Sequence, residues 1–98
     1  MPSKVRIPTP LRKLTGGLAE VSSNGGSVGE VLLNLDSNYR GLKDKLFDET
    51  GELRRFILVS LNGEDIRTLQ GQQTPVGDGD EIVIIPAIAG GSRVTRAV

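Results

Sequence analysis

Residues 80–91 read DEIVIIPAIAGG, and this stretch decides how the rest of the chain is interpreted. Residues 82–85 are apolar without alternation, which predicts a strand that is covered on both faces and lies centrally in its sheet. Pro86 ends the strand because proline has no N–H to donate. The side chains then become smaller up to Gly90 and Gly91, and this taper predicts an extended arm beyond the strand.

The N-terminal segment has the pattern of a hairpin. Val5 and Ile7 alternate with Lys4 and Arg6, which predicts a half-buried strand that ends near Pro8. The sequence Thr-Gly-Gly at residues 15–17 is a turn signal. We therefore expect residues 18–22 to return as the second arm.

A helix is expected after the glycines at positions 25 and 26. Ser27 and Glu30 have the spacing of a capping box, in which each side chain satisfies a free backbone amide of the first turn. Apolar residues then recur at helical spacing and predict one buried face. These residues are Val28, Val31, Leu32, Leu35, Tyr39, Leu42 and Leu46. Gly41 is expected to end or break the helix, followed by a short helical turn over residues 42–47.

The second half of the chain predicts further strands around the final one. Residues 55–61 read as a strand, and Asn62-Gly63 after Leu61 is a strong hairpin signal. One helix can cover one face of a small mixed sheet, so the fold class is α+β. If the last strand pairs with the first in parallel, the arrangement is a β-grasp.

Size and composition exclude several classes of function. The 98 residues suit one domain, and the 12 basic and 12 acidic residues cancel, so no net charge attracts nucleic acid. Cysteine and histidine are absent, which removes the thiolate nucleophile, the imidazole base and the usual soft metal ligands. A chain without these groups is not expected to be an enzyme.

No segment has the pattern of a membrane anchor. Residues 1–13 lack the long apolar stretch of a signal peptide, and no other stretch is long and apolar enough to span a bilayer. We therefore expect a cytoplasmic protein without membrane contact.

Two local motifs resemble ligand sites but are better explained as turns. Glycines at positions 25, 26 and 29 precede a helix, yet they fit neither phosphate-binding glycine pattern. Asp78, Asp80 and Glu81 offer carboxylates around Gly79, but the spacing of a calcium loop is missing and a turn must lead into the last strand here. We expect a helix cap and a turn, respectively.

Gly90 and Gly91 allow two interpretations. Two other Gly-Gly pairs occur at expected turns, whereas this pair follows a central strand. Residues 87–91 could extend about 17 Å, and glycines can enter a slot too narrow for other residues. The pair is either a hinge before a loosely docked tail or the tip of an arm that presents a backbone carbonyl to another protein. Composition alone does not separate these readings.

Several segments resemble the ubiquitin-like sulfur carriers of the MoaD/ThiS family, and in particular its CysO-type branch of cysteine biosynthesis. The resemblance covers residues 4–91, and these segments carry it: KVRIPTPLRKLTGG, LDSNYRGLKDKL, RRFILVSLNGEDIR and DGDEIVIIPAIAGG. It implies that the free carboxylate of Gly91 is adenylated and that its carbonyl carbon then holds sulfur as a thiocarboxylate. It also implies an extended arm formed by Pro86, Ala87, Ile88, Ala89 and Gly90.

The resemblance implies three partner enzymes and no cofactor bound by the carrier itself. An adenylating enzyme of the ubiquitin-activating type uses ATP and Mg²⁺ to activate the C-terminus. A pyridoxal-phosphate enzyme similar to cysteine synthases supplies an aminoacrylate that the thiocarboxylate attacks. A zinc metallopeptidase then releases the amino acid, and in some relatives a metallopeptidase of the JAMM type removes residues that follow the glycines.

The last seven residues depart from the simplest pattern of the family. Residues 92–98 follow the glycines, so Gly91 is bonded to Ser92 and has no free carboxylate. The hypothesis is a precursor with a carrier domain at 1–91 and an extension at 92–98, cut between Gly91 and Ser92. The alternatives are a carrier for molybdopterin, thiamin or transfer RNA, a ubiquitin-like modifier conjugated through Gly91, or an interaction domain that keeps its tail.

The sheet offers a second candidate contact surface. Phe56 and Leu58 would suit an exposed apolar face that docks a partner. Burial in the core is the more frequent fate of such residues.

Overall fold

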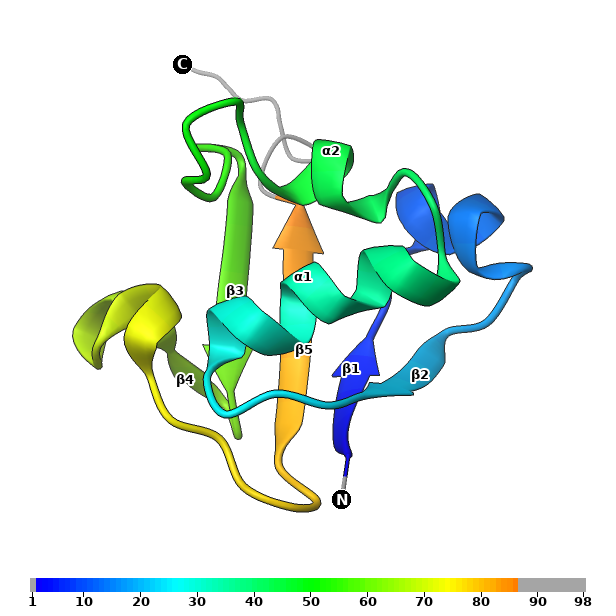
Figure 1. The fold of residues 1–98 in the computed structure, drawn as a ribbon. Helices are drawn as coiled ribbons and strands as arrows, with labels where there is room; N and C mark the ends of the chain where they lie inside the picture. Colours follow the sequence, from blue (N-terminus) through cyan, green and yellow to red (C-terminus); the bar gives the residue numbers. More distant parts are fainter. Residues whose placement is uncertain (1, 87–98) are drawn as a thin grey trace.

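The computed structural model describes residues 2–86, a mixed sheet with helices packed on it (Figure 1). The elements in chain order are β1 (Ser3–Arg6), η1 (Thr9–Thr15), β2 (Glu20–Ser23), α1 (Val28–Asn38), α2 (Leu42–Leu46), β3 (Ile57–Leu61), β4 (Glu64–Asp65), η2 (Ile66–Thr68), η3 (Gly71–Gln73) and β5 (Glu81–Pro86). Within these residues, no helix is both long and apolar enough to cross a membrane.

The sheet has the strand order β2-β1-β5-β3-β4, with the last strand of the chain at its centre. β5 runs parallel to β1, with Val5 opposite Ile82, and antiparallel to β3, with Val59 opposite Ile84. β1 and β2 form an antiparallel pair. Parallel pairing of the first and last strands confirms the β-grasp prediction.

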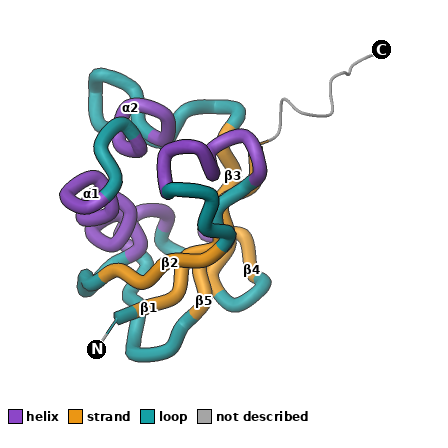
Figure 2. Tube along the Cα trace, turned by 90° about the vertical axis from the view of Figure 1, so that its right-hand side faces the viewer, coloured by secondary structure: helices purple, strands orange, loops and turns teal. Residues whose placement is uncertain are grey.

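One face of the sheet is covered by α1 and α2, which lie on the same side of the strands (Figure 2). The apolar stripe predicted for this segment is buried: Val28, Val31, Leu32, Leu35, Leu42 and Leu46 are fully enclosed, and Tyr39 packs partly against them. Opposite them, Val5, Val59, Ile82 and Ile84 supply the sheet side of the core. The amphipathic pattern of the sequence thus determines which face of the sheet is covered.

The two ends of α1 follow the sequence signals closely. Ser27 is the N-cap, and its hydroxyl accepts a hydrogen bond from the Glu30 amide at 3.3 Å. The Glu30 carboxylate reaches back one residue further than a standard capping box and accepts from the Gly26 N–H at 2.7 Å. Gly41, with φ of 99°, separates α1 from α2, as expected.

The first hairpin differs from the expectation in its connection. β1 ends at Arg6, and a 3-10 helix, η1, fills the space before the turn at Gly16 and Gly17. β2 begins at Glu20, later than the predicted start at residue 18, and Leu18 is left exposed. The long connection buries Leu11, which completes the core beside β1.

The prediction that β5 is covered on both faces is wrong, although its central position is confirmed. Burial alternates along the strand: Ile82 and Ile84 are buried, Val83 is half-buried, and 43% of Ile85 is exposed. The described residues include only one helical layer, so the other face of β5 meets solvent. An apolar run identifies a strand, but it cannot show whether protein of the same chain covers the second face.

Candidate functional site

The arm predicted from the sequence begins where β5 ends. Pro86 is the last described residue and lies opposite Ile57 of β3. The other predicted site residues, Ala87, Ile88, Ala89, Gly90, Gly91 and Ser92, lie outside the described residues. The site can therefore be described up to the base of the arm.

The base of the arm is held on both sides. β5 is paired with β1 and β3, and its Ile82 and Ile84 are locked in the core. At the start of the strand, Asn62 donates its N–H to the Glu81 carbonyl at 2.8 Å, while its side-chain oxygen accepts from the Glu81 N–H at 2.9 Å. The strand that leads to Gly91 is consequently part of the most strongly paired region of the sheet.

The uncovered side of the sheet carries an apolar patch next to the base of the arm. Leu58 lies opposite Ile85, and Ser60 lies opposite Val83, in the register of β3 and β5. We call Leu58, Val83 and Ile85 the open-face patch. It is half-buried to exposed and faces away from α1. A patch of this kind on a small protein is a typical contact surface for a partner.

The two residues proposed for this surface from the sequence behave differently. Leu58 belongs to the open-face patch, whereas Phe56 is half-buried and packs against the core. Val83 and Ile85 were missed as surface residues because they were assigned to a doubly covered strand. Their signal was present in the sequence as apolar residues at alternate positions of a strand whose only expected cover was one helix.

Charged side chains border the open-face patch on the β1 side. The Arg6 guanidinium lies 3.8 Å from the Glu20 carboxylate of β2 and 3.6 Å from that of Glu81 in β5. These side chains are about half exposed, so their pairing contributes little to stability. The pairing places charges of alternating sign beside the patch: Glu20 on β2, Arg6 on β1 and Glu81 on β5.

The two motifs that were assigned to turns from the sequence are turns in the structure. The Gly26 amide, which a phosphate would have to contact, is already bonded to Glu30. The Asp80 carboxylate accepts hydrogen bonds from the Gly77 N–H at 2.8 Å and from the Asn62 amide at 3.2 Å. These two bonds, the Gly77 bond first, hold the pKa of Asp80 below its ordinary value. Among residues 2–86, no group of three or more His, Cys, Asp or Glu side chains could hold a metal.

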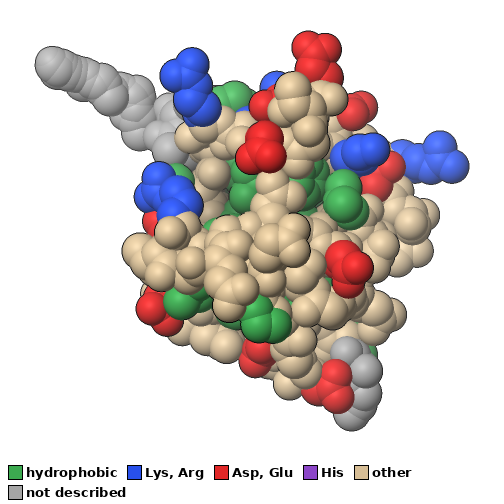
Figure 3. Space-filling view, turned by 60° about the vertical axis from the view of Figure 1, so that its left-hand side comes forward, with side chains coloured by type: hydrophobic (Ala, Val, Ile, Leu, Met, Phe, Trp, Pro, Cys, Tyr) green, Lys and Arg blue, Asp and Glu red, His purple; other side chains and the backbone are tan. Residues whose placement is uncertain are grey.

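The space-filling view from the β3 side shows apolar surface between charged side chains (Figure 3). Sequence reasoning gave no indication of a hollow here. The lining of this hollow comes from three separate segments, residues 51–59 without Phe56, 66–67 and 71–73. Such convergence of distant segments has no local sequence signal.

The β-grasp sheet, with the last strand of the chain at its centre and α1 packed on one face, defines a ubiquitin-like domain. The chain matches the model of the ThiS family over residues 5–91. It is 44% identical to the sulfur carrier protein CysO of Mycobacterium tuberculosis over 89 residues, which cover 89% of this chain and 96% of that protein. The chain therefore belongs to the ThiS family, which confirms the resemblance found in the sequence.

Solved structures agree with this assignment. The crystal structure of the Amycolatopsis orientalis BexX/CysO complex contains a chain that matches with a TM-score of 0.84 and 43% identity, covering 91% of this chain and 99% of that one. The small archaeal modifier protein 1 of Methanosarcina acetivorans matches with a TM-score of 0.78 and 38% identity, over 92% of this chain and 96% of that one. The relatives thus include both carriers and modifiers.

Proposed function

We propose that this chain is the precursor of a sulfur carrier for cysteine biosynthesis whose reactive group is the carbonyl carbon of Gly91. The observation that carries the proposal is the family match, which extends over residues 5–91 and ends on the second glycine. The similarity to CysO over nearly the same length supports the same role. The seven residues after Gly91 then form the part that is removed.

The first step follows from carbonyl chemistry. An amide such as Gly91–Ser92 has no free oxygen that can attack ATP, so the bond must be hydrolysed before activation. Water adds across it and leaves a carboxylate on Gly91 and an amine on Ser92. A zinc metallopeptidase of the JAMM type is the proposed enzyme for this step. Loss of Arg93 and Arg96 also makes the mature protein more acidic by two charges.

Activation and sulfur loading then take place on the partner enzyme. The Gly91 carboxylate attacks the α-phosphate of ATP, pyrophosphate leaves, and an acyl adenylate forms. A sulfur donor attacks the carbonyl carbon and AMP leaves with the bonding electrons, which gives the thiocarboxylate. The carrier contributes a chain end on a rigid base, while the catalytic groups belong to the adenylating enzyme.

The sulfur is then delivered to a three-carbon acceptor. The thiocarboxylate attacks the terminal carbon of an aminoacrylate held by a pyridoxal-phosphate enzyme, and a proton adds to the neighbouring carbon. The acyl group moves from sulfur to nitrogen, so the carrier ends in cysteine. Hydrolysis of the new peptide bond frees the amino acid and restores the Gly91 carboxylate.

A second candidate function is conjugation to other proteins. It is favoured by the match to the archaeal modifier protein 1 of Methanosarcina acetivorans. In that case the Gly91 acyl adenylate passes its acyl group to a lysine amine, and an isopeptide bond forms in place of the thiocarboxylate. Both functions require the same trimmed terminus.

Intact mass spectrometry of the protein from its native cells tests the proposal. A sulfur carrier is expected as a species that ends at Gly91, with a fraction in which one oxygen is replaced by sulfur. Isopeptide-linked adducts on lysines of other proteins would support the modifier instead. Recovery of only the full-length chain would contradict both, and would favour an interaction domain.

A further inference from the structure

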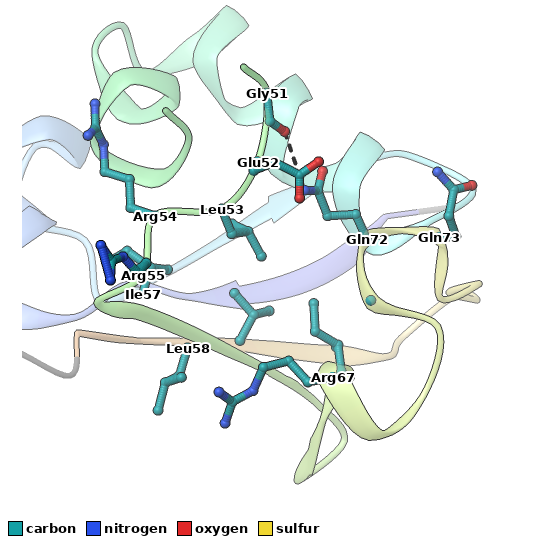
Figure 4. Close-up of a pocket in the computed structure, with 13 residues that line it drawn as sticks. Gly51, Glu52, Leu53, Arg54, Arg55, Ile57, Leu58, Arg67, Gln72 and Gln73 are labelled. Atoms are coloured by element: carbon teal, nitrogen blue, oxygen red, sulfur yellow. Dashed lines mark hydrogen bonds between the residues drawn. The ribbon is translucent and has the colours of Figure 1, made fainter. Parts of the chain in front are cut away.

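A groove lies beside the outer edge of β3, the edge that does not pair with β5, and it shares Leu58 with the open-face patch. Its volume is about 630 Å³, which is within the range of ligand-binding clefts. Five apolar residues line it: Leu53, Ile57, Leu58, Val59 and Ile66. Ile57, Val59 and Ile66 are almost fully buried, so Leu53 and Leu58, which lie on opposite sides of β3 in Figure 4, supply most of its accessible apolar surface. We call this hollow the β3 groove.

The groove exists because β4 is short. β5 pairs with all five residues of β3, but β4 pairs only with Ser60 and Leu61. At Asp65 the chain turns away, because the Asp65 carboxylate accepts the Arg67 N–H at 2.9 Å and starts η2. Among the described residues, no strand therefore accompanies the outer edge of β3 over Ile57, Leu58 and Val59.

The two walls of the groove are connected. The Gln72 side-chain amide of η3 donates to the Gly51 carbonyl at 3.3 Å and bridges the loop before β3 to the 3-10 helices (Figure 4). Leu53 on the same loop packs against the core. The groove is thus closed at one end and has a fixed apolar floor.

The charged residues that line the groove are mainly basic. Three arginines and one glutamate contribute to it: Arg54, Arg55, Arg67 and Glu52. Arg67 is paired with Asp65 at 2.6 Å, and Arg54 donates through Nε to the Asp44 carbonyl at 2.9 Å. Within residues 2–86, no ion pair involves Arg54 or Arg55. The Arg55 guanidinium is therefore available to a carboxylate, whereas Arg54, whose Nε is already bonded, contributes its positive charge.

We propose that the β3 groove binds an extended, acidic segment of a partner protein. The segment lies along β3 where β4 has turned away, with an apolar side chain on the floor and carboxylates beside Arg54 and Arg55. An extended chain can follow the free strand edge, and alternate side chains would then point into the groove. The C-terminal extension of this chain does not suit the groove, because Arg93 and Arg96 would meet like charge.

The position of the groove suits a partner that also handles the C-terminus. Ile57 at one end of the groove lies opposite Pro86, the base of the arm. A partner that holds the arm could therefore contact the groove at the same time, and the two contacts would raise the overall affinity. This last point rests on the proposed function, whereas peptide binding to the groove does not.

A peptide titration tests the inference without any sulfur chemistry. The ¹⁵N-labelled full-length chain is titrated with a short peptide that alternates valine and aspartate, and with a matched peptide that alternates valine and lysine. We expect saturable amide shifts at Leu53, Val59 and Gln72 with the acidic peptide and none with the basic one. Failure of the acidic peptide to shift these amides, or equal shifts with both peptides, would overturn the proposal.

Charge reversal supplies the matched control. Arg55→Glu should weaken binding of the acidic peptide about fivefold, because it replaces an attraction at an exposed site by a repulsion. Lys13→Glu makes the same change in total charge on exposed η1, at the opposite side of the sheet, and should leave the affinity unchanged. If both variants weakened binding equally, the loss of affinity would come from the change in net charge alone, and the inference would be contradicted.

A comparison without peptide tests two other occupants. If the full-length chain and a chain ending at Gly91 give different shifts in the groove, the tail fills it and the proposal is wrong. Shifts there that depend on protein concentration would instead indicate a second copy of the chain, and would overturn it as well. Identical, concentration-independent spectra in the groove are the expected result.

Discussion

Gly25 shows how a single backbone position constrains this fold. Its φ is 158°, and a Cβ built there would lie 2.7 Å from the Val31 backbone nitrogen and 2.9 Å from the Val31 Cγ2. The chain passes this close because it must turn from β2 into the buried first turn of α1. The sequence marked the position as a turn, but the close approach depends on residues six positions apart and could not be predicted.

Gly25→Ala should therefore lower the free energy of unfolding by about 1–3 kcal/mol, because backbone and not a flexible side chain must move. Gly26→Ala is the matched control, since its Cβ would meet only the Glu30 Oε1 at 3.3 Å, the end of a side chain that can shift, and no backbone atom. Urea denaturation of both variants provides the measurement. Equal losses in the two variants would refute the steric explanation.

The charge of Asp80 contributes to the turn that leads into β5. Hydrogen bonds from Gly77 and Asn62 lower its pKa below the ordinary value of 3.8. A carboxyl group whose pKa is lower in the folded state stabilises the fold above its unfolded pKa, and this contribution disappears as the pH falls through the folded pKa. Protonation of Asp80 should therefore account for part of the loss of unfolding free energy at acidic pH.

Asp80→Asn should make the decrease in unfolding free energy below about pH 4 less steep than in the wild type. Denaturation midpoints measured across a series of acidic pH values provide the test. Glu64→Gln, on the exposed hairpin, is the control and should leave the slope unchanged. A slope in Asp80→Asn that equals the wild-type slope would exclude this contribution.

At the scale of the element, α1 was predictable because its signals are local. Ser27, the apolar stripe and Gly41 gave its start, its buried face and its end. For β5 the central position in the sheet was predicted correctly, but the burial of both faces was not. Whether the second face is covered depends on the rest of the molecule. Local pattern determines the element, and the topology determines what each face of it meets.

Ser27→Ala should cost about 1 kcal/mol of unfolding free energy, since the Glu30 N–H at the helix start loses its acceptor. Ser27→Asp should retain most of the stability because aspartate also caps helices well. Thermal or urea denaturation would measure both. A Ser27→Asp variant as unstable as Ser27→Ala would contradict a capping role.

At the scale of the whole molecule, the uncovered side of the sheet can be mutated without disturbing the core, so its role in partner contact can be tested separately from folding. Ile85 is 43% exposed and lies in the open-face patch, so its side chain contributes little to the core. The described structure gives it no cover, although it is the neighbour of the buried Ile84. We expect this face to contact the adenylating partner while the arm enters its active site.

Ile85→Glu should reduce the kcat/KM of adenylation about tenfold or more in the chain that ends at Gly91, because a charge would be buried at the contact. Leu18→Glu is the control, as Leu18 is similarly exposed at 49% but precedes β2, an edge strand separated from β5 by β1. Pyrophosphate release measures the rate, and denaturation confirms that both variants fold. If Ile85→Glu and the parent chain were adenylated with equal kcat/KM, the open-face patch would not be part of the contact with the adenylating partner.

The whole fold could be predicted from the sequence to a large extent, since the order of elements and the central position of the last strand both follow from local patterns. The β3 groove could not, because it results from where β4 stops and from residues brought together across the chain. The chemistry of Gly91 came from the family resemblance, and composition alone left it undecided.

The central claim is that Gly91 becomes the reactive group once its carboxylate is free. The most direct measurement is the intact mass of two chains, one ending at Gly91 and one full-length, after incubation with the adenylating partner, ATP, Mg²⁺ and a sulfide source. We predict that the shorter chain exchanges one oxygen for sulfur and that the full-length chain does not change. A shorter chain that stays unmodified while the partner loads its own carrier would contradict the account.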